Sequence, residues 1–173
     1  MAMRIVLCGM MGCGKSTVGG ALAKALGWRA VDTDQIIQEK YGQISDIFKE
    51  KGEEYFRGLE TETVRTLTGL ECVVVSVGGG LVLRKENVDL LKNGGVLVYL
   101  CAEKGTLLAR LQGDNSRPLL AGDDLSARLD GLIAAREATY ESVCDFAVSV
   151  DAKSPNEIAD EIVKKLGLTW AGV

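Results

Sequence analysis

Gly9-Met10-Met11-Gly12-Cys13-Gly14-Lys15-Ser16 is the stretch of sequence that decides the fold. Its glycine, four intervening residues, glycine, lysine and serine match a pattern that cradles phosphates between a strand and a helix. The apolar run Arg4–Cys8 before it predicts a buried strand. Lys15–Leu26 carries apolar residues at helical spacing and is closed by Gly27, so it predicts a helix. Both flanks therefore agree with a phosphate-binding loop.

The chemistry of this loop indicates a nucleotide and a magnesium ion as ligands. Glycines let successive backbone N–H groups turn toward phosphate oxygens, and the helix N-terminus adds partial positive charge. Lys15 can reach the β- and γ-phosphates of ATP, and the Ser16 hydroxyl can ligate Mg²⁺. The alternative is a glycine-rich turn without a ligand. Cys13 is either a reactive thiol beside Lys15 or simply a small residue that fits the loop.

The length and composition of the chain exclude several classes of protein. A chain of 173 residues fits one domain, 1–173, and 47% apolar with 25% charged residues is a soluble globular balance. A net charge of −4 disfavours nucleic acid as a partner. The absence of histidine excludes a Ser-His-Asp hydrolase, and the five cysteines form no paired metal motif. The first apolar run is too short for a signal or membrane segment, so we expect a cytoplasmic protein with reduced thiols.

Short apolar runs alternate with helical stretches along the rest of the chain. Further strands are predicted at 30–32, 72–77, 96–101 and 146–150, and helices at 34–40 and 53–68. A last helix begins at Ser154-Pro155, with Glu157 completing a capping box, and ends near Leu166. Strands separated by helices predict an α/β fold in which helices cover both faces of a parallel sheet. The polar stretch 112–124 is a candidate mobile loop.

Two carboxylates follow the second predicted strand, in the sequence Asp32-Thr33-Asp34. Ligands of parallel sheets bind at this end of the strands, and residues two apart in a strand project to the same side. We therefore expect both side chains to face the phosphate loop. One of them could then hold the magnesium shell while the other orients a hydroxyl that accepts the phosphate. Capping of the helix at 34–40 would also explain Asp34.

The order of these and later motifs resembles the shikimate kinase family, which has the nucleoside-monophosphate-kinase-like P-loop fold. The later motifs are Phe48-Lys49-Glu50-Lys51-Gly52-Glu53-Glu54-Tyr55-Phe56-Arg57-Gly58-Leu59-Glu60, Gly78-Gly79-Gly80, Asn115-Ser116-Arg117-Pro118-Leu119-Leu120, and Arg136 with Tyr140. The resemblance spans about residues 4 to 166. The strings around Arg57 and Arg117 are specific to this family rather than to P-loop proteins in general.

The resemblance implies a three-layer fold with a five-stranded parallel sheet, and a reaction. Members of the family transfer phosphate from ATP to the 3-hydroxyl of shikimate, giving shikimate 3-phosphate and ADP in aromatic amino acid biosynthesis. We therefore expect a monomeric enzyme that uses ATP and Mg²⁺. A gluconate-type kinase and a regulatory module that binds nucleotide without turnover are the alternatives.

The resemblance also implies roles for single residues. It implies a helical region that binds the acceptor at about 34–60. The acceptor contacts it implies are those of Asp34, Arg57, Gly78, Gly79, Gly80 and Arg136. On the nucleotide side it implies contacts from Gly12, Cys13, Gly14, Lys15, Ser16, Thr17, Arg110, Arg117 and Pro155, with Arg117 in a lid at about 112–124. Asp34, Lys15 and Arg117 would be catalytic, and Ser16 and Asp32 would serve the metal.

Simpler explanations exist for the acceptor residues. Arg57 is spaced to pair with Glu53 or Glu60 on the surface of a helix, and Arg136 has no acidic neighbour three or four positions away. Both would then be ordinary solvated arginines. The three glycines would be a flexible strand exit, and Pro155 is explained by the start of its helix.

Overall fold

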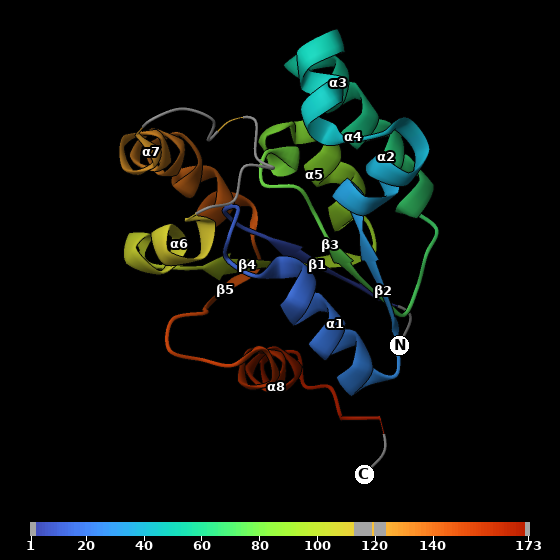
Figure 1. Ribbon diagram of the computed structural model, residues 1–173. Coiled ribbons are helices and arrows are strands. Elements are labelled where there is room, and N and C mark those ends of the chain that lie inside the picture. The colour runs from blue at the N-terminus through green and yellow to red at the C-terminus, as the bar shows by residue number, and fades with distance from the viewer. Residues whose placement is uncertain (1–2, 113–118, 120–123, 172–173) are drawn as a thin grey trace.

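The computed structural model describes residues 3–112, 119 and 124–171. Five parallel strands form one sheet in the order β2-β3-β1-β4-β5 (Figure 1). The strands are β1 Arg4–Cys8, β2 Arg29–Asp32, β3 Val73–Ser76, β4 Gly95–Cys101 and β5 Phe146–Ser149. All five predicted strands are present, and they pair in parallel as expected. β1 and β3 are buried along their whole length, as apolar strands in the middle of a covered sheet must be.

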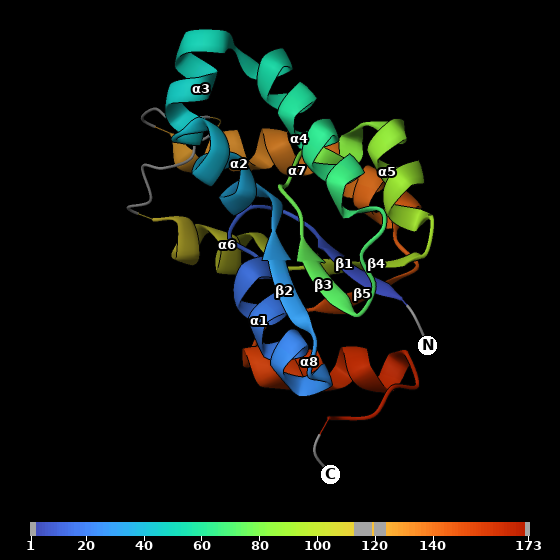
Figure 2. The ribbon, with the colours of Figure 1, turned by 90° about the vertical axis from the view of Figure 1, so that its right-hand side faces the viewer.

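Helices cover both faces of the sheet (Figures 1 and 2). They are α1 Lys15–Leu26, α2 Thr33–Tyr41, α3 Ile44–Lys51, α4 Glu53–Leu67, α5 Lys85–Lys92, α6 Lys104–Leu111, α7 Leu125–Val143 and α8 Pro155–Lys165, with a short 3₁₀ helix η1 at Leu81–Leu83. α1 and α8 lie side by side on one face, whereas α4, α5 and α7 cover the other. The three-layer prediction is thus confirmed. None of the described helices has the length and apolar character needed to cross a membrane.

The predicted start of the last helix is confirmed in detail. The Ser154 side chain accepts a hydrogen bond from the Glu157 backbone N–H, and the Glu157 carboxylate accepts one from the Ser154 N–H. Pro155 occupies the first turn, where its missing N–H costs nothing. The pattern did not single out α3, α5, α6 or α7 as helices. Of the candidate loop at 112–124, only Gln112, Leu119 and Asp124 lie within the described residues.

The strand order brings three chain segments to one edge of the sheet. The phosphate loop follows β1, Asp32 ends β2, and Gly78-Gly79-Gly80 follows β3. Because these strands are parallel neighbours, their carboxyl ends meet at the same edge, where parallel sheets bind ligands. α2, α3 and the start of α4 rise above this edge (Figure 2). The candidate site is therefore assembled by the topology of the sheet.

At the opposite edge a buried arginine holds two helix ends together. Arg4 is 1% exposed, and its Nη1 donates to the carbonyl oxygens of Leu67 (2.8 Å) and Thr68 (3.0 Å) at the end of α4. Its Nη2 donates to the carbonyls of Asn93 (2.8 Å) and Leu91 (3.3 Å) at the end of α5. Helix C-termini carry partial negative charge, so these carbonyls can accept a cation. No carboxylate of the described residues forms an ion pair with Arg4.

Candidate active site

The phosphate loop adopts a shape that its glycines make possible. Gly12 and Gly14 have positive φ angles of 81° and 92°, which side chains with a Cβ rarely adopt. Lys15 lies along the loop, and its Nζ donates to the carbonyl oxygens of Gly9 (2.9 Å) and Met10 (3.0 Å). The loop thus presents a lysine ammonium and the N-terminus of α1 on one side of the sheet edge.

A cavity of about 260 Å³ adjoins the outer side of this loop. It is lined by Cys13, Gly14, Thr17, Val18, Arg110, Lys153, Pro155 and Ile158. Arg110 Nη1 donates to the carbonyl oxygens of Cys13 (3.1 Å) and Gly12 (3.3 Å), so α6 is attached to the phosphate loop. Cys13 is 1% exposed, which favours the small-residue interpretation of its thiol. Of the residues expected around a nucleotide, those that line this cavity are Cys13, Gly14, Thr17, Arg110 and Pro155. Ser16 lines the second cavity, Gly12 and Lys15 line neither, and Arg117 lies outside the described residues.

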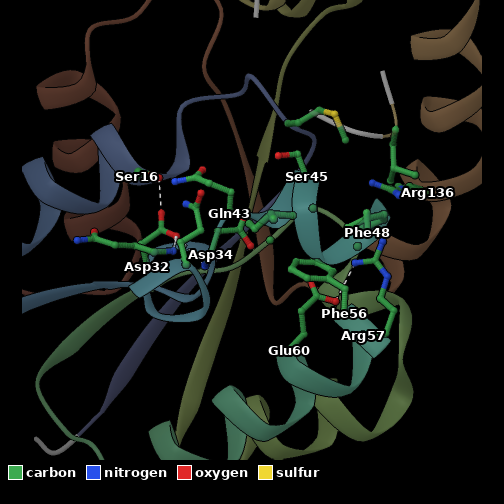
Figure 3. Close-up of a pocket in the computed structure, with 18 residues that line it drawn as sticks. Ser16, Asp32, Asp34, Gln43, Ser45, Phe48, Phe56, Arg57, Glu60 and Arg136 are labelled. Carbon is green, nitrogen blue, oxygen red and sulfur yellow. Dashed lines mark hydrogen bonds and ion pairs between the residues drawn. The ribbon is translucent and has the colours of Figure 1, made fainter. Parts of the chain in front are cut away.

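Ser16 and Asp32 lie together at one end of a second cavity (Figure 3). The Ser16 hydroxyl donates to Asp32 Oδ2, and Asp32 Oδ1 accepts the backbone N–H groups of Asp34 (2.9 Å) and Gln35 (3.2 Å). Asp32 is therefore the N-cap of α2, and the alternative explanation of Asp34 as the cap of this helix is wrong. The strand argument was also wrong for Asp34, because β2 ends at Asp32 and Asp34 belongs to the first turn of α2. Both carboxylates nevertheless line the same cavity.

The donor atoms at Ser16 and Asp32 suit magnesium. They are a hydroxyl and a carboxylate, the hard oxygen ligands that Mg²⁺ prefers. Among the described residues no group of three or more His, Cys, Asp or Glu side chains could hold a metal by itself. Mg²⁺ usually keeps several waters and substrate phosphate oxygens, so it needs only this sparse protein contribution. The residues therefore fit the ion.

The second cavity has a volume of about 470 Å³ and is the larger of the two. Its lining includes Met11, Ser16, Asp32, Asp34, Gln35, Gln38, Gln43, Ile44, Ser45, Phe48, Phe56, Arg57, Glu60, Gly78, Gly79, Gly80, Leu119 and Arg136. The structure thus brings all six expected acceptor residues together, from α2, α4, α7 and the segment after β3. Figure 3 shows Ser16 and Asp32 at one end of this cavity and Arg57 and Arg136 at the other.

The two arginines are buried. Arg57 is 8% exposed and pairs with Glu60 (Nη1–Oε2, 2.7 Å) and Glu53 (Nη2–Oε1, 2.8 Å). The pairing suggested by its spacing is therefore present, but the solvated surface position is not. Arg136 is 4% exposed, and its Nη1 has no hydrogen-bond partner within the described part of the chain. Burying an unsatisfied charged donor costs free energy, so this guanidinium is suited to an anionic ligand that enters the cavity.

Charged side chains approach two of the three glycines, Gly78 and Gly80, closely. A Cβ placed on Gly78 would lie 2.7 Å from Asp34 Oδ1 and 2.8 Å from Glu60 Oε1. A Cβ on Gly80 would overlap the Arg57 guanidinium. Any larger residue at either position would displace a charged side chain of the cavity. The segment is therefore a wall of the larger cavity.

Glu60 is the most important lining residue to which the sequence assigned no role. Its side chain is 1% exposed, and Oε1 has no hydrogen-bond partner among the described residues. Burial raises the pKa of Glu60 to about 7, although the adjacent Arg57 guanidinium acts in the opposite direction. The Asp34 carboxylate adds to the increase. The spacing of three residues after Arg57 was the available signal, but only the fold reveals that the pair is buried.

The raised pKa of Glu60 predicts a pH-dependent cost in stability. Between its ordinary value of 4.5 and about 7, the folded protein binds a proton that the unfolded chain has released. The unfolding free energy therefore falls as pH rises through this window, by at most about 1.4 kcal/mol per pH unit. Glu60→Gln removes this contribution. We expect the difference in unfolding free energy, wild type minus variant, to decrease from pH 4.5 to 7 in urea titrations.

Glu62 supplies the matched control on the same helix. Its hydrogen bond with Lys40 lowers its pKa, and it is exposed to solvent. The difference in unfolding free energy between wild type and Glu62→Gln should therefore rise with pH only below about 4.5, and it should stay flat from pH 4.5 to 7, where the difference for Glu60 decreases. A difference for Glu60 that is flat or rising from pH 4.5 to 7 would contradict the assignment of a raised pKa.

Comparisons with known proteins agree with this architecture. A family model described as shikimate kinase matches residues 11–167. A shikimate kinase from Geobacter sulfurreducens is 43% identical over 159 residues, which cover 91% of this chain and 87% of that protein. The structure of shikimate kinase from Acinetobacter baumannii in complex with shikimate superposes with a TM-score of 0.92 at 33% identity, covering 95% of this chain and 92% of that one. The Aquifex aeolicus shikimate kinase gives 0.83 at 36% identity, covering 95% and 96%.

The match is long and it includes the parts of the chain that build both cavities. The matched residues run from the phosphate loop through α2–α4 and α7 to Gly167, just beyond the end of α8. A shared fold alone would leave the acceptor undefined, since P-loop folds carry many activities. Family model, sequence relatives and structures all agree instead. The chain belongs to the shikimate kinase family.

Proposed function

We propose that this protein transfers the γ-phosphoryl group of ATP to the 3-hydroxyl of shikimate, giving shikimate 3-phosphate and ADP. The observation that carries the proposal is the pair of buried guanidinium groups, Arg57 and Arg136, in a cavity that also holds Asp34 and borders the phosphate loop. Shikimate is a small cyclic carboxylate with three hydroxyls. Its carboxylate suits two buried arginines, whose planar groups bind carboxylates in a bidentate manner.

The position of Asp34 supports a role in the reaction itself. Asp34 lies between the arginine end of the cavity and the end with Ser16 and Asp32 (Figure 3). An acceptor held by its carboxylate at Arg57 and Arg136 would direct its opposite side toward Asp34. We propose that Asp34 orients the 3-hydroxyl and takes its proton as the phosphoryl group arrives. Gly78, Gly79 and Gly80 would complete the wall around the acceptor.

The nucleotide would enter from the other side of the phosphate loop. Its base would lie in the smaller cavity between Arg110 and Pro155, and its phosphates would follow the backbone from Gly12 to Thr17. Lys15 would leave the carbonyls of Gly9 and Met10 to neutralise the transferred group. Mg²⁺, held near Ser16 and Asp32, would supply positive charge to the phosphate oxygens. The expected role of Arg117 on the same phosphate rests on the family resemblance alone.

We also propose that the enzyme acts as a cytoplasmic monomer on free small molecules, without nucleic acid or membrane. The acidic net charge of −4 and five free thiols support this.

An ADP-release assay with parallel acceptors tests the proposed reaction. Shikimate, gluconate and nucleoside monophosphates are supplied in turn with ATP and Mg²⁺, and the product is identified by ³¹P NMR. We expect rapid ADP release and a phosphate monoester with shikimate only. Release with gluconate or a nucleotide in place of shikimate would refute the acceptor. Nucleotide binding without acceptor-dependent release would favour a regulatory module.

A further inference from the structure

Tyr140 lies where the two halves of the site meet. It belongs to α7, one helical turn after Arg136, and is fully buried. Its hydroxyl donates to the carbonyl oxygen of Gly79 at 2.6 Å and lies 3.6 Å from Met10 Sδ. Gly79 belongs to the acceptor wall and Met10 to the phosphate loop. A single hydroxyl therefore contacts both.

The hydroxyl has one proton, and the geometry shows where it goes. The carbonyl at 2.6 Å is a strong acceptor at a short distance, whereas a thioether is a weak one. Burial raises the pKa of Tyr140 well above its usual range, so the phenol stays protonated at all working pH values. Tyr140 therefore acts as a permanent donor to Gly79.

Fixing the Gly79 carbonyl also fixes the following N–H. The C=O of Gly79 and the N–H of Gly80 belong to one planar trans peptide, so they point in opposite directions. With the carbonyl held by Tyr140, the Gly80 N–H must point away from α7. Both glycines line the larger cavity, and within the described residues neither the Gly79 N–H nor the Gly80 N–H has a protein acceptor. These donors are available to a ligand.

The same glycine touches the phosphate loop. A Cβ on Gly79 would lie 3.5 Å from the Gly9 carbonyl oxygen, 3.6 Å from the Met11 N and 3.5 Å from Arg136 Nη1. These are ordinary packing distances, so the two loops are in contact at this point. Rotation of the Gly79–Gly80 peptide would therefore move the N–H groups that are available to the acceptor, and it would also change the surroundings of Arg136.

We infer that Tyr140 is a positioning residue whose hydroxyl orients the Gly79–Gly80 peptide and thereby aims its N–H at the acceptor. This rests on the proposed function, because the acceptor is taken to be the carboxylate-bearing alcohol of that reaction. Tyr140 does not touch the reacting atoms. Its effect passes through Gly79, and through Arg136 on the same helix.

Tyr140→Phe tests the inference by removing one oxygen and leaving the ring in place. Tyr99→Phe is the matched control: its ring lies 5.2 Å from that of Tyr140, it is 5% exposed, and its hydroxyl makes no hydrogen bond within the described residues. We expect Tyr140→Phe to raise the KM for shikimate about tenfold, as one lost orienting hydrogen bond can. The Kd for ATP alone should stay within twofold of wild type, and Tyr99→Phe should leave both constants unchanged.

The outcomes separate a positioning role from a structural one. The inference would be overturned if Tyr140→Phe left the KM for shikimate unchanged, or if it weakened ATP binding as much as it raised this KM. It would also be overturned if Tyr99→Phe raised the KM for shikimate by the same factor. Thermal unfolding of both variants shows whether they remain folded at the assay temperature. If Tyr140→Phe did not fold, proton NMR of the wild type would test the inference instead. A Tyr140 hydroxyl proton that exchanges slowly with solvent, resonates downfield and lies close to Gly79 and Gly80 would support it. The absence of such a proton signal would contradict it. Lack of ADP release by the wild type would refute the proposed function instead.

Discussion

Replacing Lys15 by methionine is expected to lower kcat by about 10³-fold or more, because water cannot replace the ammonium group in its proposed role of neutralising the transferred phosphate. Methionine keeps the length and apolar stem of the side chain, so the loop keeps its packing. The variant leaves the carbonyls of Gly9 and Met10 without the Lys15 donor, and a modest decrease in thermal stability should accompany the loss of activity. Steady-state ADP release with saturating ATP and shikimate measures the effect.

Lys24 offers a control on the same helix. It lies in the last turn of α1, is exposed, and lines neither cavity. Lys24→Met removes the same charge from the protein and should leave kcat within about twofold of wild type, as expected for an exposed position. A Lys15→Met enzyme that kept a tenth of wild-type turnover would refute the assignment of Lys15 to the phosphate.

Asp34→Asn is expected to reduce kcat by about 10²- to 10⁴-fold, the usual contribution of a positioned general base. Asparagine keeps the size of the side chain and its place in the first turn of α2, but it cannot accept a proton from the 3-hydroxyl. The affinity for ATP should change little, since Asp34 lines only the larger cavity and not the smaller one in which the base of the nucleotide is proposed to lie. Single-turnover phosphoryl transfer separates this chemical defect from slow product release.

Asp46→Asn is the corresponding control in the first turn of α3, on an exposed residue outside both cavities. It should match wild type in kcat and KM. Near-normal turnover of Asp34→Asn would mean that the hydroxyl reaches the phosphate without this carboxylate, and Asp34 would then be an orienting residue at most. A large loss in both variants would point to helix destabilisation instead.

The sequence predicted best those parts that local rules determine. The phosphate loop, β1, α1 and the capping box at Ser154 depend on neighbouring residues, and each was found where the pattern indicated it. Apolar strands such as β3 were also recognisable because a covered parallel sheet demands continuous burial. Their edges shifted by a residue or two, as helix and strand ends commonly do.

The remainder depended on contacts between distant segments. Asp34 faces the cavity from a helix, because β2 ends at Asp32, which caps α2, and so stops two residues before Asp34. α3 begins at Ile44 without a side-chain cap, so no local signal marked its start. The burial of Glu60 and Arg136 follows from the approach of the segment after β3, which spacing along one helix cannot reveal.

The attachment of Arg4 to α4 depends on no titrating carboxylate. Its partners at the end of α4 are carbonyl oxygens, which keep the same charge at every working pH. Near the beginning of the same helix, the Arg57–Glu60 pair lies within α4 and changes its charge when Glu60 takes up a proton. A change of pH therefore alters the charge of the cavity wall, whereas the anchor of α4 at the opposite edge of the sheet keeps its strength.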